Sequence, residues 1–450
     1  MKQLVTLMIC CLLPLGALAQ ESSQQSYSLT LQQAIDHALQ NNYTAVNASR
    51  DIEIAQQRKR ETTAAGLPQI NAGVDYTNNF VIPKSVVPAQ LINPEASPDE
   101  FAAVEFSPKQ SMTARAQLSQ LIFDGSYLVA LQASKTYLKF YENAKRKTNT
   151  EIKEMVINSY GNVLVAEESI RILERNKQIL DKTLFDTEQT FKNGLIEEEN
   201  VEQLKITAAS INSNLNNTRR VAIMSYKMLK LALGIDINAP LTLTDKLEDL
   251  TQTTLAAQLT QGEFSVNNNI DYLMAQNFTE QRQLELKLEK SMALPSLSAN
   301  LNFGYNTFGQ DFTFLNNEQK WYNYSFLGMT LNVPIFSGFR RSARTQQAKI
   351  RVEQADTQLT ETEQRLKLEY ENARSQFEFS VEEYSTAKDN LALAERIERK
   401  QQTKFTEGLS SSFEFAEAQR QLYSAQQQFL RSMINVINTK ASLENISNTN

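Results

Sequence analysis

Few side chains in this sequence could carry out chemistry. Cys10 and Cys11 are its only cysteines and His37 is its only histidine. Both cysteines lie in the first apolar run, so the rest of the chain has no thiol for a disulfide, a nucleophile or a metal site. One histidine is too few for most zinc sites. No G-x-x-x-x-G-K-[ST] motif is present, so no P-loop binds a nucleotide. We therefore predict a protein that is not an enzyme, with no catalytic residue, no metal and no cofactor.

Carboxylates are the remaining reactive groups. A pair of them can hydrolyse glycosides, but no pair stands out from the charged helix faces. Glu414 and Glu417 are of interest because they are three residues apart and so share one face of a helix. Ser411-x-x-Glu414 also has the pattern of a capping box, which gives Glu414 an alternative, structural role.

The N-terminus and the charge limit the location of the chain. Lys2, the apolar run from Leu4 to Leu15 and the A-x-A pattern Ala17-Leu18-Ala19 predict a cleaved signal peptide, residues 1–19. The net charge of −6, with both signs mixed, argues against nucleic acid as a partner. No later segment is apolar enough for a transmembrane helix. In a membrane, the chain would have to contribute strands to a closed barrel.

Two long stretches favour very long helices. No proline occurs between Pro108 and Pro240 or after Pro334. A helix of ~65 residues would extend ~100 Å. Small and apolar residues recur in these stretches with alternating steps of three and four, which is typical of coiled coils. The clearest series is Val201, Leu204, Ala208, Ile211, Leu215, Thr218, Ala222, Ser225, Leu229 and Ala232.

The sequence also repeats itself, which predicts a duplicated protomer. Ile122-Phe123-Asp124-Gly125 matches Ile335-Phe336-Ser337-Gly338 at an offset of 213. Phe191-x-x-Gly194-Leu195 matches Phe405-x-x-Gly408-Leu409 at an offset of 214, and Leu67-Pro68 matches Leu294-Pro295 at an offset of 227. The larger offset places an insertion in the first half, which we interpret as a long external loop, 83–108.

Four segments alternate between apolar and polar residues and predict strands with one face of each kind. Their length of about ten residues suits a tilted membrane strand. Asp75 and Arg115 fall on polar faces and are expected in a water-filled lumen. Trp321, Tyr322 and Tyr324 suggest an aromatic girdle at the outer interface, although Tyr322 and Tyr324 oppose the parity of Leu327, which leaves the register of the fourth strand open. Four strands cannot close a barrel, so three copies would give twelve strands and two would give eight.

In order, these doubled motifs resemble the TolC-type outer-membrane efflux factor family over nearly the whole chain after the signal. The resemblance also rests on Leu29-x-x-x-x-Ala34 through Asn41-Asn42. It implies a mostly α protein with a membrane β part. An internally duplicated protomer would contribute four strands to a shared trimeric 12-strand β-barrel. Its long coiled-coil helices would form a periplasmic α-barrel.

The resemblance also implies partners and sites. It implies a homotrimer in the lipid bilayer of the cell outer membrane, with its tunnel in the periplasm. A periplasmic adaptor protein would link it to an inner-membrane efflux pump. Gly194, Leu195, Gly408 and Leu409 would be tips that dock the adaptor, whereas the glycines by themselves need no more than a helix C-cap role. Glu414 and Glu417 would line a periplasmic gate.

We therefore expect a passive exit duct of a tripartite efflux or type I secretion system. The alternative is a soluble periplasmic coiled-coil adaptor or structural protein, which would not explain the duplicated strands. The expected organisation after the signal is 20–66, helices of the girdle and tunnel; 67–122, the first β-hairpin; 123–234, the first helical hairpin; 235–293, an equatorial segment and helix; 294–335, the second β-hairpin; and 336–450, the second helical hairpin and tail.

Overall fold

The computed structural model describes residues 26–256 and 264–447. The predicted signal peptide, 1–19, lies outside these ranges. Within the described residues, no helix is both long enough and apolar enough to cross a membrane.

The duplication extends to the lengths of the helices. A helix of 22 residues, one of 68 and one of 36 in the first half match helices of 22, 67 and 36 residues in the second. In the first half these are α2 (Tyr43–Ala64), α3 (Gly125–Lys192) and α4 (Glu198–Leu233); in the second they are α6 (Ile270–Ser291), α7 (Arg340–Thr406) and α8 (Ser412–Ser447). The very long helices predicted from the absence of proline are confirmed.

The repeat begins earlier in each half than the sequence motifs indicated. Strand β1 (Tyr27–Leu29) precedes helix α1 (Leu31–Asn41), and strand β6 (Leu241–Leu243) precedes helix α5 (Leu247–Ala256). The two strands pair in parallel with Tyr27 opposite Leu241, an offset of 214. The two halves of the chain therefore meet at equivalent residues. Leu29-Thr30 and Leu243-Thr244 were the sequence signal for this pairing.

The chain divides into two compact units, each built from both halves. Among the described residues, the first unit comprises 26–46, 148–256, 264 and 368–447. Its core includes Tyr160 of α3, which is fully buried. The Tyr160 hydroxyl lies 3.1 Å from the Leu29 carbonyl oxygen and 3.0 Å from Oδ2 of Asp245, and that same Oδ2 accepts a 2.6 Å hydrogen bond from the Leu31 amide. Burial raises the pKa of Tyr160, so the phenol stays protonated and can donate.

The heptad positions pack as the sequence predicted. In α4 the buried residues include Val201, Leu204, Leu215, Ala222 and Leu229. In α7 a strict seven-residue series is buried: Leu366, Ala373, Ser380, Ala387 and Ala394. The side chains are small, which allows neighbouring helix backbones to approach closely. Glu398 continues the α7 seam as a buried carboxyl group, and its burial raises its pKa.

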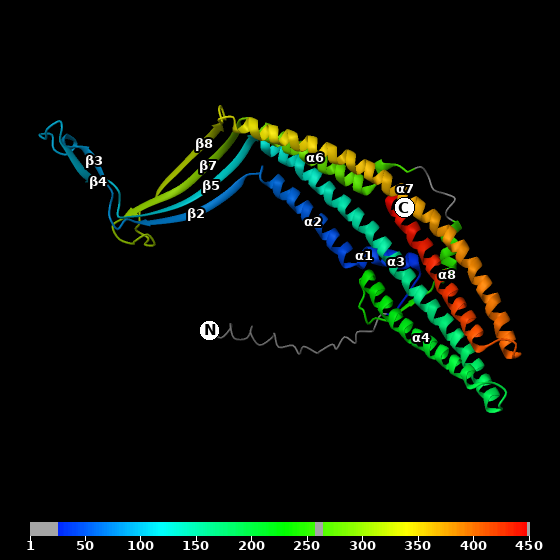
Figure 1. The fold of residues 1–450 in the computed structure, drawn as a ribbon. Helices are drawn as coiled ribbons and strands as arrows, with labels where there is room; N and C mark the ends of the chain where they lie inside the picture. The colour runs from blue at the N-terminus through cyan, green and yellow to red at the C-terminus, as the bar shows by residue number, and fades with distance from the viewer. Residues whose placement is uncertain (1–25, 257–263, 448–450) are drawn as a thin grey trace, which may run out of the picture. The chain divides into compact units, whose positions relative to one another are not determined.

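The second unit comprises 47–147 and 265–367. It contains one antiparallel sheet of four strands in the order β2-β5-β7-β8 (Figure 1). The strands are β2 (Gln69–Asn78), β5 (Gln110–Asp124), β7 (Ser296–Gly309) and β8 (Tyr322–Asn332). Strands β2 and β8 form its two edges.

The predicted external loop, 83–108, is more ordered than expected. It contains a two-stranded hairpin of β3 (Lys84–Pro88) and β4 (Phe101–Glu105), with a 3₁₀ turn at Ala89–Leu91. Figure 1 shows this hairpin beyond the ends of β2 and β5. Val87 of β3 lies opposite Ala102 of β4, and cross-strand pairs of this kind stabilise the hairpin. The prolines that suggested a loop stand at the strand ends or outside them.

Gly234 offers a test of this fold. It caps α4 with φ 74°, and a Cβ there would collide with the backbone carbonyl of Asn41 at the end of α1. Gly194 has the same φ, but a Cβ there would meet nothing within 4 Å. Gly194→Ala should cost ~1–2 kcal/mol from the left-handed backbone alone. Gly234→Ala should cost ~1–3 kcal/mol more, because the backbones of α1 and α4 must separate.

Thermal unfolding followed by far-UV circular dichroism would compare the two variants. Equal melting temperatures would contradict the packing of α4 against the end of α1.

Candidate functional site

The first candidate site is the four-stranded sheet, whose two faces differ in chemistry. One face carries apolar residues in register across the strands: Ala72 opposite Ala116, which is opposite Phe303, and Leu301 opposite Leu327. Most of these apolar side chains are exposed, among them Ile70, Val74, Leu301, Phe303, Leu327, Met329 and Leu331. An ordinary soluble sheet would cover such a face with another layer. Exposed contiguous apolar surface of this kind marks a lipid or protein contact.

The opposite face is polar over most of its area. Asn71, Gln117 and Asn302 form one cross-strand row, and Asp75, Thr113 and Asn306 form another. The predicted pair Asp75 and Arg115 lies on this face, with 3.2 Å between Oδ2 of Asp75 and Nη1 of Arg115. Both side chains remain about half exposed, so this ion pair adds little stability. Their position in a lumen stays a prediction.

The register of the fourth strand is resolved by the sheet. Leu327, Met329 and Leu331 lie opposite Leu301, Ala299 and Leu297 on the apolar face. Tyr322, Tyr324 and Phe326 therefore fall on the polar face, opposite Asn306, Gly304 and Asn302. Gly304 leaves space for the ring of Tyr324, which lies 2.6 Å from where a Cβ would be. The predicted lipid-facing girdle is thus wrong for Tyr322 and Tyr324, because strand parity places them on the other side.

The second candidate site is the pair of helix tips. Gly194 follows α3 with φ 74° and Gly408 follows α7 with φ 72°. The amides of Leu195 and Leu409 donate to the carbonyls of Thr190 and Lys404, at 3.2 and 2.8 Å. The amides of the two glycines donate to the carbonyls of Phe191 and Phe405. Both ends are therefore Schellman caps, which confirms the C-cap role of the glycines.

Each cap presents a leucine to solvent. Leu195 is 74% exposed and Leu409 is 72% exposed. A Schellman cap often packs the residue after its glycine against the helix, and here neither leucine is covered. The repetition of an exposed leucine at equivalent positions points to a contact surface rather than to a packing role.

The predicted gate residues differ in their surroundings. Glu414 forms the capping box: its Oε2 accepts from the Ser411 amide at 3.0 Å, and its amide donates to the Ser411 hydroxyl at 3.2 Å. Its Oε2 also accepts a 2.7 Å hydrogen bond from the Ser410 hydroxyl. These hydrogen bonds hold the pKa of Glu414 below its ordinary value, and the hydrogen bond from Ser410 has the largest effect.

Glu417 is paired with a cation. Its Oε2 accepts from both Nε and Nη2 of Arg420, one turn further along α8, and the Nε distance is 3.1 Å. Arg420 and Gln421 hold the pKa of Glu417 below its ordinary value. Both carboxylates are therefore charged at neutral pH. The charge of Glu417 is partly neutralised within the chain, which sequence spacing alone did not reveal.

A cavity of about 850 Å³ lies beside the tips. Residues from both helical hairpins line it, including Lys182, Asp186, Asn200, Leu409 and Glu414. Its walls are mostly hydroxyl, amide and charged side chains. The cavity thus connects the exposed leucine of the second tip with one of the two predicted gate residues.

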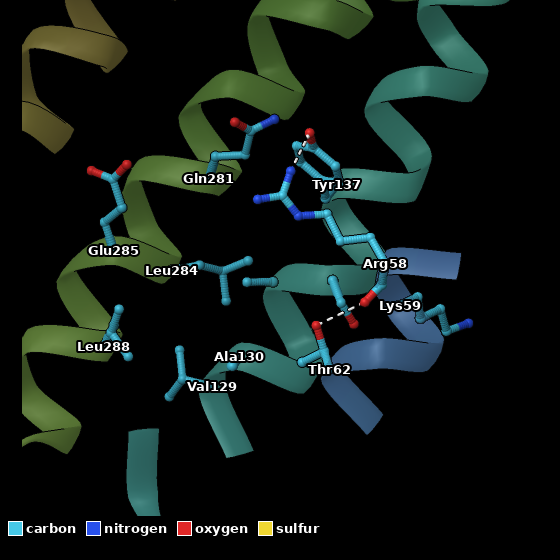
Figure 2. A pocket seen from close by; sticks show the side chains of 12 residues that line it. Arg58, Lys59, Thr62, Val129, Ala130, Tyr137, Gln281, Leu284, Glu285 and Leu288 are labelled. Carbon is cyan, nitrogen blue, oxygen red and sulfur yellow. Dashed lines mark hydrogen bonds between the residues drawn. The ribbon is translucent and has the colours of Figure 1, made fainter. Parts of the chain in front are cut away.

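A smaller cavity of about 340 Å³ lies between α2, α3 and α6 (Figure 2). Arg58 spans one side, with its guanidinium 5.1 Å from the ring centre of Tyr137 and Nη1 donating to the Tyr137 hydroxyl at 3.1 Å. Val129, Leu284 and Leu288 form an apolar wall. The cavity brings together no nucleophile and base. Among the described residues, no cluster of three or more His, Cys, Asp or Glu side chains could hold a metal.

Comparisons with known proteins match this architecture. The model of the outer membrane efflux protein family matches residues 265–449. The outer membrane protein TolC of Vibrio cholerae is 21% identical over 351 residues, which cover 78% of this chain and 73% of that protein.

Solved structures match across both halves of the chain. The channel protein CusC superposes with a TM-score of 0.71 at 17% identity, covering 96% of this chain and 95% of CusC. VceC from Vibrio cholerae superposes with a TM-score of 0.69 at 17% identity, covering 92% and 95%. The duplicated helices and strands, the family match to the second half and the similarity to TolC agree. Residues 265–449 match the outer membrane efflux protein family, the whole chain has the fold of the solved channels, and both indicate a place in the cell outer membrane.

Proposed function

We propose that this protein is a passive exit duct, which carries substrates from an inner-membrane pump and a periplasmic adaptor to the outside of the cell. The observation that carries the proposal is the four-stranded sheet, with its exposed apolar face and two unpaired edges. Lipid would cover the apolar face. Copies of the chain would pair β8 of one with β2 of the next, and no strand edge would then remain open.

Three copies supply twelve strands and two supply eight, and the family resemblance favours three. In a closed barrel the face with Asp75 and Arg115 would line the lumen. The long helices would continue the lumen through the periplasm. A soluble periplasmic adaptor or structural protein is the alternative, and it would leave the apolar face of the sheet exposed to water.

The helix tips would form the contact with the adaptor. Leu195 and Leu409 offer apolar anchors on a polar surface, at the end of each long helix. Exposed anchors of this kind dominate the binding energy of many interfaces. Three copies would present six such leucines, two from each chain.

Glu414 and Glu417 would form the gate. A ring of carboxylates in a narrow pore attracts cations and repels anions. In a trimer the two positions would contribute six carboxylates. Arg420 offsets part of this field at Glu417, so Glu414 would carry the larger share despite its capping role.

The first prediction concerns assembly, and it uses two neighbouring residues of β8. Met329→Arg places a charge on the apolar face, whereas Thr330→Arg places the same charge on the polar face. Met329→Arg should reduce assembly severely, because an arginine facing lipid costs ~2–4 kcal/mol in each copy. Thr330→Arg should assemble like the wild type.

The measurement is the amount of a compact trimer, resistant to detergent before heating, in the outer-membrane fraction. Equal assembly of the two variants, or a wild type that is a monomer in the periplasm, would refute the duct.

The second prediction concerns the tips. Changing Leu195 and Leu409 together to Asp should weaken adaptor binding by more than tenfold, because loss of an interface anchor costs ~2 kcal/mol or more. The matched control changes both to Met, which keeps an apolar side chain of similar size. Adaptor crosslinking and export of a fluorescent drug would be measured in cells with equal amounts of trimer. Unchanged crosslinking in the Asp variant would reject the docking role.

The third prediction concerns the gate. Glu414→Gln with Glu417→Gln should remove most of the cation preference in single-channel recordings. Glutamine at 414 can still complete the capping box, so the helix start should persist. Glu198→Gln, at the first turn of α4, is the control.

The pH dependence of the wild type adds a check. The pKa values of Glu414 and Glu417 lie below the ordinary range, so both carboxylates stay charged as the pH falls. Cation preference should therefore persist to pH 5 and be lost only below about pH 4.3, the ordinary pKa of glutamate. A loss between pH 7 and 6 would point to other groups.

A further inference from the structure

The connection between β8 and α7 exposes three large apolar side chains. Strand β8 ends at Asn332 and α7 begins at Arg340. Between them Ile335 is 89% exposed, Phe336 is 76% exposed and Phe339 is 77% exposed. The two phenylalanine rings meet edge to face, with 5.8 Å between their centres.

The equivalent residues of the first half are less exposed, Ile122 at 50% and Phe123 at 39%. Strand β5 ends at Asp124 and α3 begins at the next residue, Gly125. The Asp124 carboxylate accepts from the amides of Ser126 and Tyr127, so it caps the helix directly. The predicted I-F-x-G turns therefore differ: Ile122 and Phe123 belong to β5, whereas Ile335 and Phe336 lie outside any strand. The duplicated fold itself does not require the exposed residues of the second connection.

Two exposed arginines adjoin the apolar residues. Arg340 and Arg344 form no salt bridge within 4.0 Å in the part of the chain that the structure describes. The sequence has no Asp or Glu between Glu318 and Glu353. Arg341 is different, because its Nη2 donates to the carbonyl of Pro334 at 3.0 Å and stabilises the connection. Arg340 and Arg344 are thus the cations left without a role in the fold.

Helix stability does not explain these two arginines. The partial positive charge at the start of a helix disfavours cations there and favours them at its end. Lys290 in the last turn of α6, Lys192 in that of α3 and Lys404 in that of α7 follow this rule. Arg340, the first residue of α7, opposes it, and Arg344 lies one turn further along. A negatively charged partner outside the chain would compensate them.

The position in the fold indicates the partner. In a protein of the outer membrane, the end of a membrane strand marks the edge of the hydrocarbon layer, and α7 continues into the periplasm. Apolar side chains at this level can insert among acyl chains, while neighbouring arginines reach the lipid phosphates. Arginine suits phosphate because its planar guanidinium can donate two parallel hydrogen bonds.

We propose that Ile335, Phe336, Phe339, Arg340 and Arg344, here called the junction patch, bind an anionic phospholipid of the periplasmic leaflet. The apolar residues contact its acyl chains and the arginines contact its headgroup phosphate. The proposal rests on the outer-membrane location and not on the transport function. It assigns this patch the role of setting the depth of each protomer in the membrane.

A second copy of the chain is the other possible occupant, since β8 is an edge strand. The other edge of the sheet, β2, follows the end of α2, where Arg58, Lys59 and Arg60 stand with the single acid Glu61. Pairing β8 with β2 of another copy would bring these cations toward Arg340 and Arg344. Like charges would then repel, and an anionic lipid between them would bind more strongly. The charges therefore favour lipid over protein at the arginines.

Native mass spectrometry of the full-length protein, stripped of lipid in detergent, tests whether Arg340 and Arg344 bind the lipid headgroup. Phosphatidylglycerol should bind at least tenfold more tightly than phosphatidylcholine, and Arg340→Gln with Arg344→Gln should abolish this preference. Lys349→Gln with Arg351→Gln, further along the same helix, removes two charges outside the patch and should keep it. No preference in the wild type, or the same preference in the Arg340 and Arg344 variant, would overturn the proposal.

Fluorescence quenching tests the apolar residues of the junction patch and shows whether lipid or protein covers them. Trp321 is the only tryptophan, so Trp321→Phe with Phe336→Trp places one probe in the patch. In phosphatidylglycerol vesicles with brominated acyl chains, this tryptophan should be quenched strongly. Trp321→Phe with Phe413→Trp, at an exposed position beside the second tip, should not be quenched. A probe at 336 that is shielded from brominated lipid would show that protein covers the patch, and the proposal would fail.

Discussion

The structure depends on a sheet whose two edges and apolar face need partners outside the chain. Four strands leave two edges with unpaired backbone groups and one apolar face without a covering layer. In water this combination would aggregate. In a bilayer, lipid can cover the face, but the edges still need hydrogen-bond partners, because hydrocarbon offers none. The closed ring of copies proposed above would answer both needs.

Duplication explains how one chain supplies the parts of such a ring. Each half contributes a pair of strands, a very long helix and a shorter returning helix. The halves join at equivalent residues in the β1–β6 pair and carry equivalent Schellman caps at their tips. The halves differ where a specific role is expected. The second tip has a full capping box at Ser411 and Glu414, whereas the side chain of Glu197, at the N-cap of α4, makes no capping hydrogen bond.

The charges near the second tip have structural roles besides the gate role proposed for them. Glu414 satisfies backbone amides at the start of α8 and still leaves a carboxylate beside a polar cavity. Glu417 pairs with Arg420, so the electric field of the Glu417 carboxylate is shorter in range. Further along α7, the buried Glu398 interrupts an otherwise small and apolar seam. Its burial raises the pKa of this carboxyl group, because burial penalises the charged form.

The sequence by itself determined the elements and their repetition. Missing prolines and heptad spacing predicted the long helices, and strand parity predicted the two-faced strands, because both depend on local periodicity. The tertiary structure decided what periodicity leaves open. It placed Tyr322 and Tyr324 on the polar face, because the position of a strand in a sheet is set by its neighbour. It paired Glu417 with Arg420, since spacing cannot tell which rotamers meet. It also showed that the two I-F-x-G segments differ in structure, because Asp124 caps α3 directly at the end of β5, whereas Ile335 and Phe336 lie outside any strand.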